Sequence, residues 1–292
     1  MPEIISYVAR LKQDFKRIEI KMMELLDIST IEEFRNDPDS VIVFIKPPYY
    51  WGETDEQQKL LQIQLVKDYS AWFKHFRLLF GKASDEIKEQ IDEVHEFITG
   101  WIEKESSWDI PSNIEDAKSL FREKVKVLYE FLNLLGTPDE EIILVPDTNS
   151  LIAAPDVTQY ADVAGQPKYK IVIVPTVLAE LDKLKVLHRD QDFRDKVNSV
   201  IKRIKGLRTQ GSLLTGVTVN KSVTVKMIAT EPNFDNTFEW LNSENNDDRI
   251  IASVLELQRE NPSSIAILVT SDINLQNKAE MSNLPFVEPP VP

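Results

Sequence analysis

Four carboxylates in the second half of the chain stand at positions from which they could share one chemical site: Asp147, Glu180, Asp247 and Asp272. Two follow a short apolar run within three residues, one lies a turn into the helix expected after another such run, and one opens a helix. A bare cluster of carboxylates is unfavourable, because like charges a few ångströms apart raise one another's pKa or push the site apart. A hard divalent cation removes that conflict, and oxygen ligands favour Mg²⁺ or Mn²⁺ over zinc.

An acidic site with few protein ligands for each ion is typical of phosphoryl transfer. Such an ion would lower the pKa of a bound water for in-line attack on phosphorus, and it or a second ion would stabilise the leaving oxygen. Taken singly, each acid also has a structural interpretation: Asp147, Asp247 or Asp272 could cap a helix, and Glu180 could be a solvated position. Their joint placement is what favours the metal site.

A parallel sheet is expected to bring these acids together. Strands are predicted at residues 142–145, 171–174, 223–228 and 266–269, and helices at 176–187, 192–207 and 247–259. Alternating strands and helices imply right-handed crossovers and a parallel sheet. The carboxyl ends of such strands form the edge where α/β sheets bind ligands. The sequence therefore predicts an α/β domain with the four carboxylates in one cleft, and a loop or hairpin at 213–222.

Four sequence motifs around the acids resemble those of PIN-domain nucleases. They are residues 146–152, 174–184, 246–252 and 269–275, in the order and with the spacing of that family. The likeness is closest to the larger PIN domains, such as those attached to PhoH-type ATPases or found in eukaryotic RNA-decay endonucleases, and it covers about residues 141–288. It implies a Rossmann-like α/β/α domain that cuts RNA with Mg²⁺ or Mn²⁺.

The same resemblance assigns roles to individual residues. Carried over position by position, Asp147, Glu180, Asp247 and Asp272 become the catalytic and metal-binding acids, with Asn149, Asp248, Thr270 and Ser271 as supporting polar groups. Asp247 matches the family better than Asp248, because an apolar residue follows the family's acid by three positions, as Ile250 does here. Asp182 also recurs in the motif and is interpreted as structural.

Basic residues beside the second acid could bind the substrate. Nine lysines and arginines fall within residues 183–208, and the contacts that we predict are Lys183, Lys185, Arg189 and, from another motif, Arg249. A helix with such a face could lie along a phosphate backbone. The alternative is a solvated face whose apolar residues turn inward, namely Val197, Val200, Ile201, Ile204 and Leu207.

The charge and composition restrict the function classes. The formal charge is −14, of which residues 1–140 carry −10, so the first half is a poor candidate for binding nucleic acid. The second half carries −4, which one or two divalent ions would bring close to neutral.

The absence of cysteine excludes disulfides, zinc–thiolate sites and thiol catalysis, and it suits a reducing cytoplasm. No signal peptide and no apolar run near the ~20 residues of a membrane span are visible, so we expect a soluble, cytoplasmic protein.

The sequence pattern of residues 1–136 predicts an all-α helical domain of unknown role. Thr137-Pro138-Asp139 is the predicted boundary between it and a PIN-like domain at 141–292. Helical patterns occur at residues 3–26, 30–36, 54–79, 84–103 and 113–135. Residues 41–45 are strand-like but run into two prolines, so 47–51 is interpreted as a turn or loop.

Aromatic residues and histidines of this half are interpreted as structural. Trp51, Trp72, Trp101 and Trp108 fit core filling better than a partner-binding surface. His75 and His95 each lack a second ligand at metal spacing.

The sequence as a whole predicts a metal-dependent endoribonuclease with a C-terminal catalytic domain. Single-stranded RNA is the expected substrate, and the helical domain could bind a protein partner or mediate self-association. Two alternatives stay open. One is a non-catalytic adaptor, in which the acid cleft is vestigial or binds metal only for stability. The other is a structure-specific DNA nuclease, because the sequence shows no aromatic base-stacking surface that would distinguish RNA from DNA as the substrate.

Overall fold

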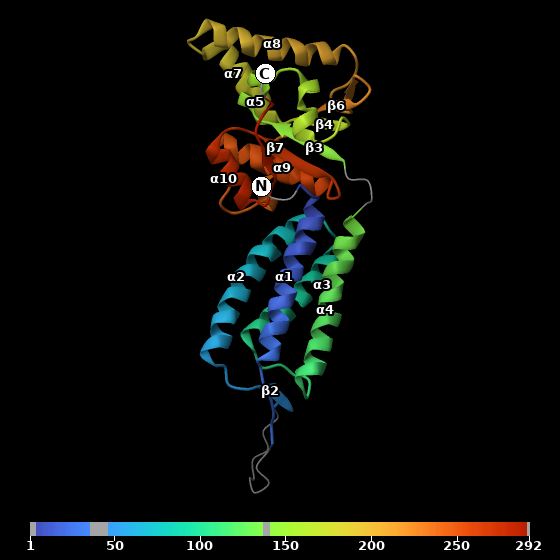
Figure 1. Cartoon of the computed structure of the whole chain (residues 1–292), viewed down its shortest axis with the longest axis vertical. Coiled ribbons are helices and arrows are strands. Elements are labelled where there is room, and N and C mark those ends of the chain that lie inside the picture. The colour runs from blue at the N-terminus through green and yellow to red at the C-terminus, as the bar shows by residue number, and fades with distance from the viewer. Residues whose placement is uncertain (1–3, 36–45, 137–140, 291–292) are drawn as a thin grey trace. The chain divides into compact units, whose positions relative to one another are not determined.

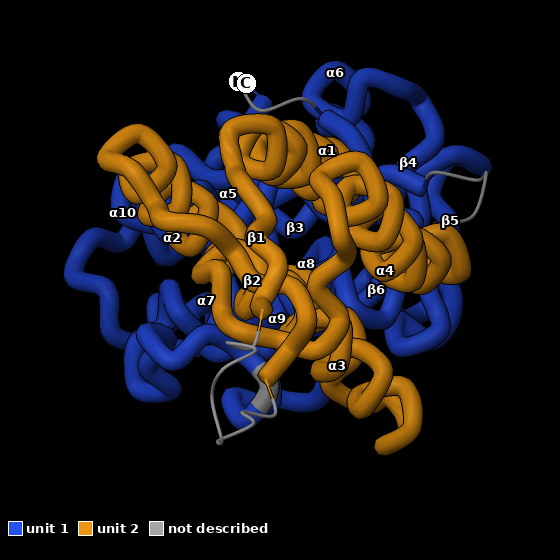
Figure 2. Tube along the Cα trace, turned by 90° about the horizontal axis from the view of Figure 1, so that it is seen from below, with its two compact units in different colours: residues 1–8, 137–292 blue, residues 9–136 orange. Residues whose placement is uncertain are grey.

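The computed structural model describes residues 4–35, 46–136 and 141–290, and it divides into two compact units (Figures 1 and 2). Residues 9–136 form one, which we call the helical unit. Residues 137–292 together with residues 1–8 form the other, which we call the α/β unit. Among the described residues, no helix is both long enough and apolar enough to cross a membrane.

Long amphipathic helices build the described part of the helical unit. They are α1 (Tyr7–Asp27), α2 (Glu56–Leu79), α3 (Asp85–Glu103) and α4 (Ile114–Leu135). Their core is aromatic: the rings of Phe15 and Trp72 lie 4.4 Å apart, and the Trp72 indole N–H donates to the Leu11 carbonyl at 2.8 Å. Core filling is confirmed for Trp51, Trp72 and Trp101, which are buried, but it is wrong for Trp108, which is 62% exposed.

A short hairpin replaces the helix predicted for residues 30–36. Strand β1 (Ile31–Glu33) pairs antiparallel with β2 (Tyr49–Trp51), so the loop expected at 47–51 is also wrong. The Ser29 hydroxyl donates back to the Leu25 carbonyl at the end of α1 instead of capping a new helix. Pairing with a distant strand therefore overrides a local capping pattern. The strand-like run 41–45 lies outside the described residues.

The α/β unit is organised around a six-stranded sheet of order β5-β6-β4-β3-β7-β8. Its strands are β3 (Ile142–Pro146), β4 (Tyr169–Ile173), β5 (Val217–Val219), β6 (Val223–Met227), β7 (Ile265–Val269) and β8 (Phe286–Val287). Strand β3 pairs in parallel with β4 and β7, and β4 pairs in parallel with β6. The four predicted parallel strands are thus confirmed. Strand β5 completes a hairpin with β6, and the two-residue β8 is too short to have a sequence pattern.

Helices cover this sheet on both faces, as the expected α/β class requires. They are α5 (Thr148–Ala153), α6 (Ala161–Ala164), α7 (Pro175–Leu187), α8 (Gln191–Arg208), α9 (Asn246–Glu260) and α10 (Ile273–Met281), with 3₁₀ turns at Val157–Tyr160 and Phe234–Asn236. In Figure 1, α5, α7 and α8 lie on one side of the strands, and α9 and α10 lie on the other. Because α5, α7 and α10 directly follow β3, β4 and β7, their N-termini gather at the carboxyl edge of the sheet.

We predict that residues 1–136 fold without the rest of the chain, because the helical unit has an aromatic core of its own. A fragment of these residues should give a helical circular dichroism spectrum and a single cooperative urea transition. Four of the five tryptophans belong to it, so their fluorescence reports the transition directly. A spectrum without helix, or a transition without cooperativity, would refute the boundary.

We also predict that the helical unit loses stability in mild acid through His75. Burial, with a smaller contribution from the positive charge of Arg10, lowers the pKa of His75 to about 4. Unfolded histidine titrates near 6.5, so the unfolded state gains a proton first and stability falls between about pH 6.5 and 4. The loss is at most about 3 kcal/mol. In His75→Gln, urea midpoints should fall less over this range, and an identical decline in both proteins would contradict the assignment.

Candidate active site

Asp147 is held inside the protein at the junction of the two central strands. It caps α5 by accepting from the backbone N–H of Ser150 at 2.6 Å, and it is only 4% exposed. Its other carboxylate oxygen accepts from the Thr270 hydroxyl at 2.5 Å. Thr270 directly follows β7, so this bond joins the ends of β3 and β7. Thr270 thus contacts the first predicted acid, and its supporting role in a metal site stays a prediction.

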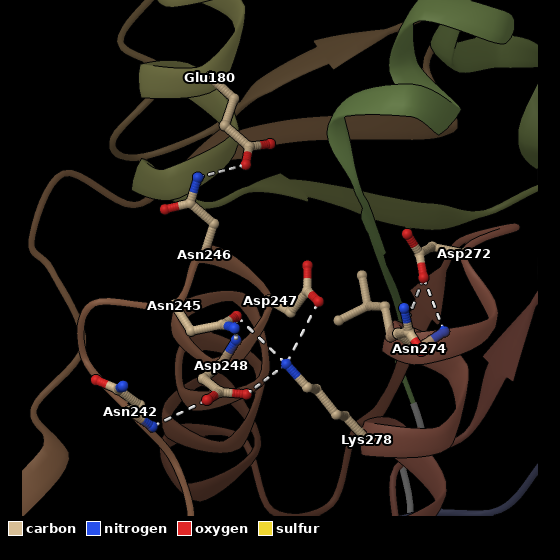
Figure 3. A network of polar contacts seen from close by, with 10 residues as sticks. Glu180, Asn242, Asn245, Asn246, Asp247, Asp248, Asp272, Asn274 and Lys278 are labelled. Atoms are coloured by element: carbon tan, nitrogen blue, oxygen red, sulfur yellow. Dashed lines mark hydrogen bonds and ion pairs between the residues drawn. The ribbon is translucent and has the colours of Figure 1, made fainter.

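Asp272 lies two residues beyond Thr270 and caps the next helix. Its Oδ1 accepts from the backbone N–H groups of Asn274 at 2.8 Å and Leu275 at 3.2 Å, at the start of α10 (Figure 3). Its own backbone N–H donates to the Thr270 hydroxyl oxygen at 3.0 Å. One threonine therefore connects Asp147 and Asp272. Unlike Asp147, Asp272 is exposed, and so is its neighbour Ser271, for which no contact is seen that would define a role.

Glu180 connects the second motif to the first and third. It projects from α7, half-buried, and one oxygen accepts from the side-chain amide of Asn246 at 2.6 Å (Figure 3). Its other oxygen accepts from the Thr148 hydroxyl. Thr148 follows Asp147 in the chain, and Asn246 precedes Asp247. A hydrogen-bonded path thus runs between three segments that are far apart in sequence.

Asp247 and Asp248 share the first turn of α9 but face different surroundings. Asp248 is 5% exposed and accepts from the backbone N–H of Asn242 at 2.9 Å. The Asp247 side chain is 36% exposed. The Nζ of Lys278 lies 2.8 Å from Asp248 Oδ1 and 3.3 Å from Asp247 Oδ2. Figure 3 shows its side chain pointing toward both carboxylates. Asp248 is therefore committed to the interior, and Asp247 is the one of the two that a bound ion could reach.

Lys278 is the main residue of this network that the sequence did not reveal. Partial burial alone would lower its pKa, but the hydrogen bonds and charges of Asp248 and Asp247 raise that pKa above its usual value. Thr148 and Asn246 were also missed. Only adjacency to a predicted acid could have indicated these two, and Lys278 stands in an ordinary helical pattern.

The carboxylates do not converge on one point as the sequence analysis expected. In the part of the chain that the structure describes, no three acidic or histidine side chains form a group able to hold a metal ion. Each acid instead binds nearby donors, which limits the repulsion between like charges. The donors that the site offers are carboxylate, hydroxyl and amide oxygens, and this chemistry fits Mg²⁺ or Mn²⁺.

A hollow of about 350 Å³ opens beside Glu180. It is lined by Thr148, Asn149, Glu180, Lys183, Leu184, Leu187, His188 and Asn246. Two predicted residues, Asn149 and Lys183, thus border the acid network. Lys185 and Arg189 are exposed near the end of α7, outside this lining. Arg249 pairs with Glu231 at 2.6 Å, so its charge is already compensated within the protein.

Helix α8 has the amphipathic arrangement weighed above. Val197 and Val200 are buried, whereas Ile201, Ile204 and Leu207 are half-buried. Its exposed cations are Lys196, Lys202, Arg203, Lys205 and Arg208. Arg203 lies 3.8 Å from Asp156, a separation at which an exposed pair contributes little to stability. Contact between this face and phosphate stays a prediction.

Comparison with known proteins identifies the family of the α/β unit. Residues 144–288 match the PIN domain family, and all four predicted acids fall within the match. The chain is also similar to the human protein named Transcriptional protein SWT1, with 28% identity over 153 residues. That similarity covers 51% of this chain and 16% of the human protein, so the chain spans only a small part of that relative. Through residues 144–288, this chain belongs to the PIN domain family.

Proposed function

We propose that the α/β unit is a divalent-metal-dependent endoribonuclease that hydrolyses phosphodiester bonds of single-stranded RNA. The observation that carries the proposal is the hydrogen-bonded network at the carboxyl edge of the sheet. Its hydrogen bonds hold Asp147, Glu180 and Asp272 directly. Asp247 belongs to it as the chain neighbour of Asn246 and through its bond from Lys278. The match of residues 144–288 to the PIN domain family, a nuclease-type fold, supports the same proposal, and all four acids lie within the matched residues.

These four acids would hold Mg²⁺ or Mn²⁺. When bound, the ion would supply Lewis acidity and an acidified water for attack on phosphorus. The chain's own groups prepare the site. The Ser150 N–H and the Thr270 hydroxyl hold the Asp147 carboxylate in one orientation, and Thr148 and Asn246 do the same for Glu180. The ammonium group of Lys183, in the adjoining hollow, would bind a substrate phosphate.

Lys278 acts in this proposal as a positioning residue. Lys278 donates to Asp247 and Asn245 at 3.3 Å each, and its Nζ forms an ion pair with Asp248 at 2.8 Å. Lys278 belongs to α10, the helix that Asp272 caps, and it contacts the first turn of α9, which carries Asp247. The ion pair thus sets how two of the acids face each other.

Two other functions are outcomes of the same experiment. A non-catalytic adaptor is favoured by the absence of a ready-made metal cluster among the described side chains. A DNA nuclease would use the same acids. Labelled single-stranded RNA and DNA of one sequence, incubated with Mg²⁺, Mn²⁺ or EDTA, separate the three functions.

We predict metal-dependent cutting of RNA that is abolished by EDTA. Asp147→Asn and Glu180→Gln should each reduce the rate by at least about 100-fold, because even residues that only support metal ligands cost roughly 10- to 100-fold. Asp182→Asn is the matched control, since Asp182 is exposed on the same helix as Glu180 and should keep near wild-type activity.

The contradicting outcomes of this test are distinct. Cutting that is equal in wild type and Asp147→Asn would locate the activity elsewhere. No cutting of any substrate by a folded, metal-supplemented protein would favour the adaptor, and cutting of DNA alone would favour the DNA nuclease.

We predict that Lys278→Met destabilises the α/β unit by about 2–3 kcal/mol. Removing one partner of a fully buried pair costs roughly 3–5 kcal/mol, and the 23% exposure of the Lys278 side chain reduces that figure. Lys205→Met on the exposed face of α8 should change the unfolding free energy by less than about 0.5 kcal/mol. Adding Asp248→Asn should recover part of the loss. Additive losses in the double variant would mean that the two side chains do not interact.

A further inference from the structure

We propose that the hollow beside Glu180 binds one unpaired nucleotide of the substrate chain, next to the bond that is cut. The inference rests on the proposed function, since it assigns a subsite to that reaction. It makes the single-strand preference a property of this hollow and of the helix α7 that forms much of its wall.

The hollow combines the surfaces that a nucleotide needs. Leu184 and Leu187 provide an apolar wall, and the ring of the lining residue His188 lies 4.1 Å from that of Phe193. Flat apolar and aromatic surfaces bind the face of an unstacked base. The amides of Asn149 and Asn246 can pair with a base edge or a ribose hydroxyl. A space of about 350 Å³ is at the small end of ligand sites and suits one nucleotide unit.

The position of the hollow places such a nucleotide beside the acids. Glu180, Thr148 and Asn246 belong both to the lining and to the hydrogen-bonded network. Lys183 is three residues after Glu180 in α7, and side chains at this spacing lie on the same face of a helix. A nucleotide seated on the apolar wall would thus have its phosphate between Lys183 and the acids.

Cations near the hollow could contact a phosphate backbone, although Glu180, Asp182 and Asp190 balance their charge along the sequence and the whole chain carries −14. Lys183, Lys185 and Arg189 are exposed cations grouped at the end of α7. Such a group attracts a phosphate backbone. A base inside a duplex is stacked and paired and cannot enter the hollow without being extruded, at a cost of a few kcal/mol. The occupant is therefore a nucleotide of a single strand.

Helix α7 offers a matched pair of positions for the test. Leu187 lines the hollow and is 67% exposed, whereas its neighbour Val186 is 70% exposed and is not part of the lining. Leu187→Glu and Val186→Glu add the same charge to the same turn, and both positions are open to water. A difference in RNA affinity between the two variants is therefore caused by the hollow, and not by the added charge or by misfolding.

Binding is measured by fluorescence anisotropy with a labelled single-stranded RNA, a DNA of the same sequence and the corresponding duplex. EDTA prevents metal-dependent cutting. Leu187→Glu should weaken single-strand binding by roughly tenfold or more relative to Val186→Glu. The loss of contact with the face of one base lowers affinity by about this factor. Duplex binding should be the same in both variants. Equal losses in RNA and DNA would assign the contact to the base, and a loss in RNA alone would include the ribose hydroxyl; both support the subsite.

Two results would overturn the subsite: identical single-strand affinities in the two variants, or a loss for Leu187→Glu that is as large for duplex as for single strand. Cutting by the wild-type protein is assayed in parallel with Mn²⁺. Cutting without any effect of Leu187→Glu on binding refutes the subsite alone. A selective binding loss in a protein that does not cut refutes the nuclease and retains a nucleotide-binding site.

Discussion

The bond from the Thr270 hydroxyl to the Asp147 carboxylate is the contact on which the rest of the site depends. It joins the ends of the two central parallel strands, β3 and β7, in a buried setting where a charge-assisted bond is strong. The same threonine accepts from the backbone of Asp272, so two acids 125 positions apart are set by one side chain. Parallel pairing of β3 with β7 over five residue pairs makes this meeting unavoidable.

The other contacts of the network reduce the repulsion between its negatively charged carboxylates. Five carboxylates lie at one edge of the sheet, and each accepts from a backbone N–H, a hydroxyl, an amide or an ammonium group. The lysine that compensates the charges of Asp247 and Asp248 comes from α10, the helix that Asp272 caps. Helices α9 and α10 are thereby tied together at the point where the proposed chemistry takes place. The same contacts therefore stabilise the fold and position the side chains of the proposed site.

The helical unit illustrates where local patterns fail. Helices α1, α3 and α4 follow from their apolar spacing, because each buries one continuous stripe. The hairpin of β1 and β2 does not follow, since a three-residue strand is stabilised only by its partner, which lies 18 positions away along the chain. Trp108 shows the same limit for burial: its residue type favours the core, and its place in an exposed turn between α3 and α4 decides otherwise.

The sequence by itself determined the four parallel strands, the helices α7, α8 and α9 and the family, because apolar periodicity and short motifs are local properties of the chain. The shorter helices α5 and α10 were not predicted. The resemblance to the family also favoured Asp247 over Asp248, through the spacing to Ile250, and the structure adds that Asp248 is the more buried of the two. Only the tertiary structure decided which donor binds each acid and that Lys278 compensates the charges of two of them. It alone also showed that Arg249 forms an ion pair with Glu231 and that a hollow opens beside Glu180. These features depend on side chains from different elements meeting in space, and no local pattern encodes the direction in which a side chain turns.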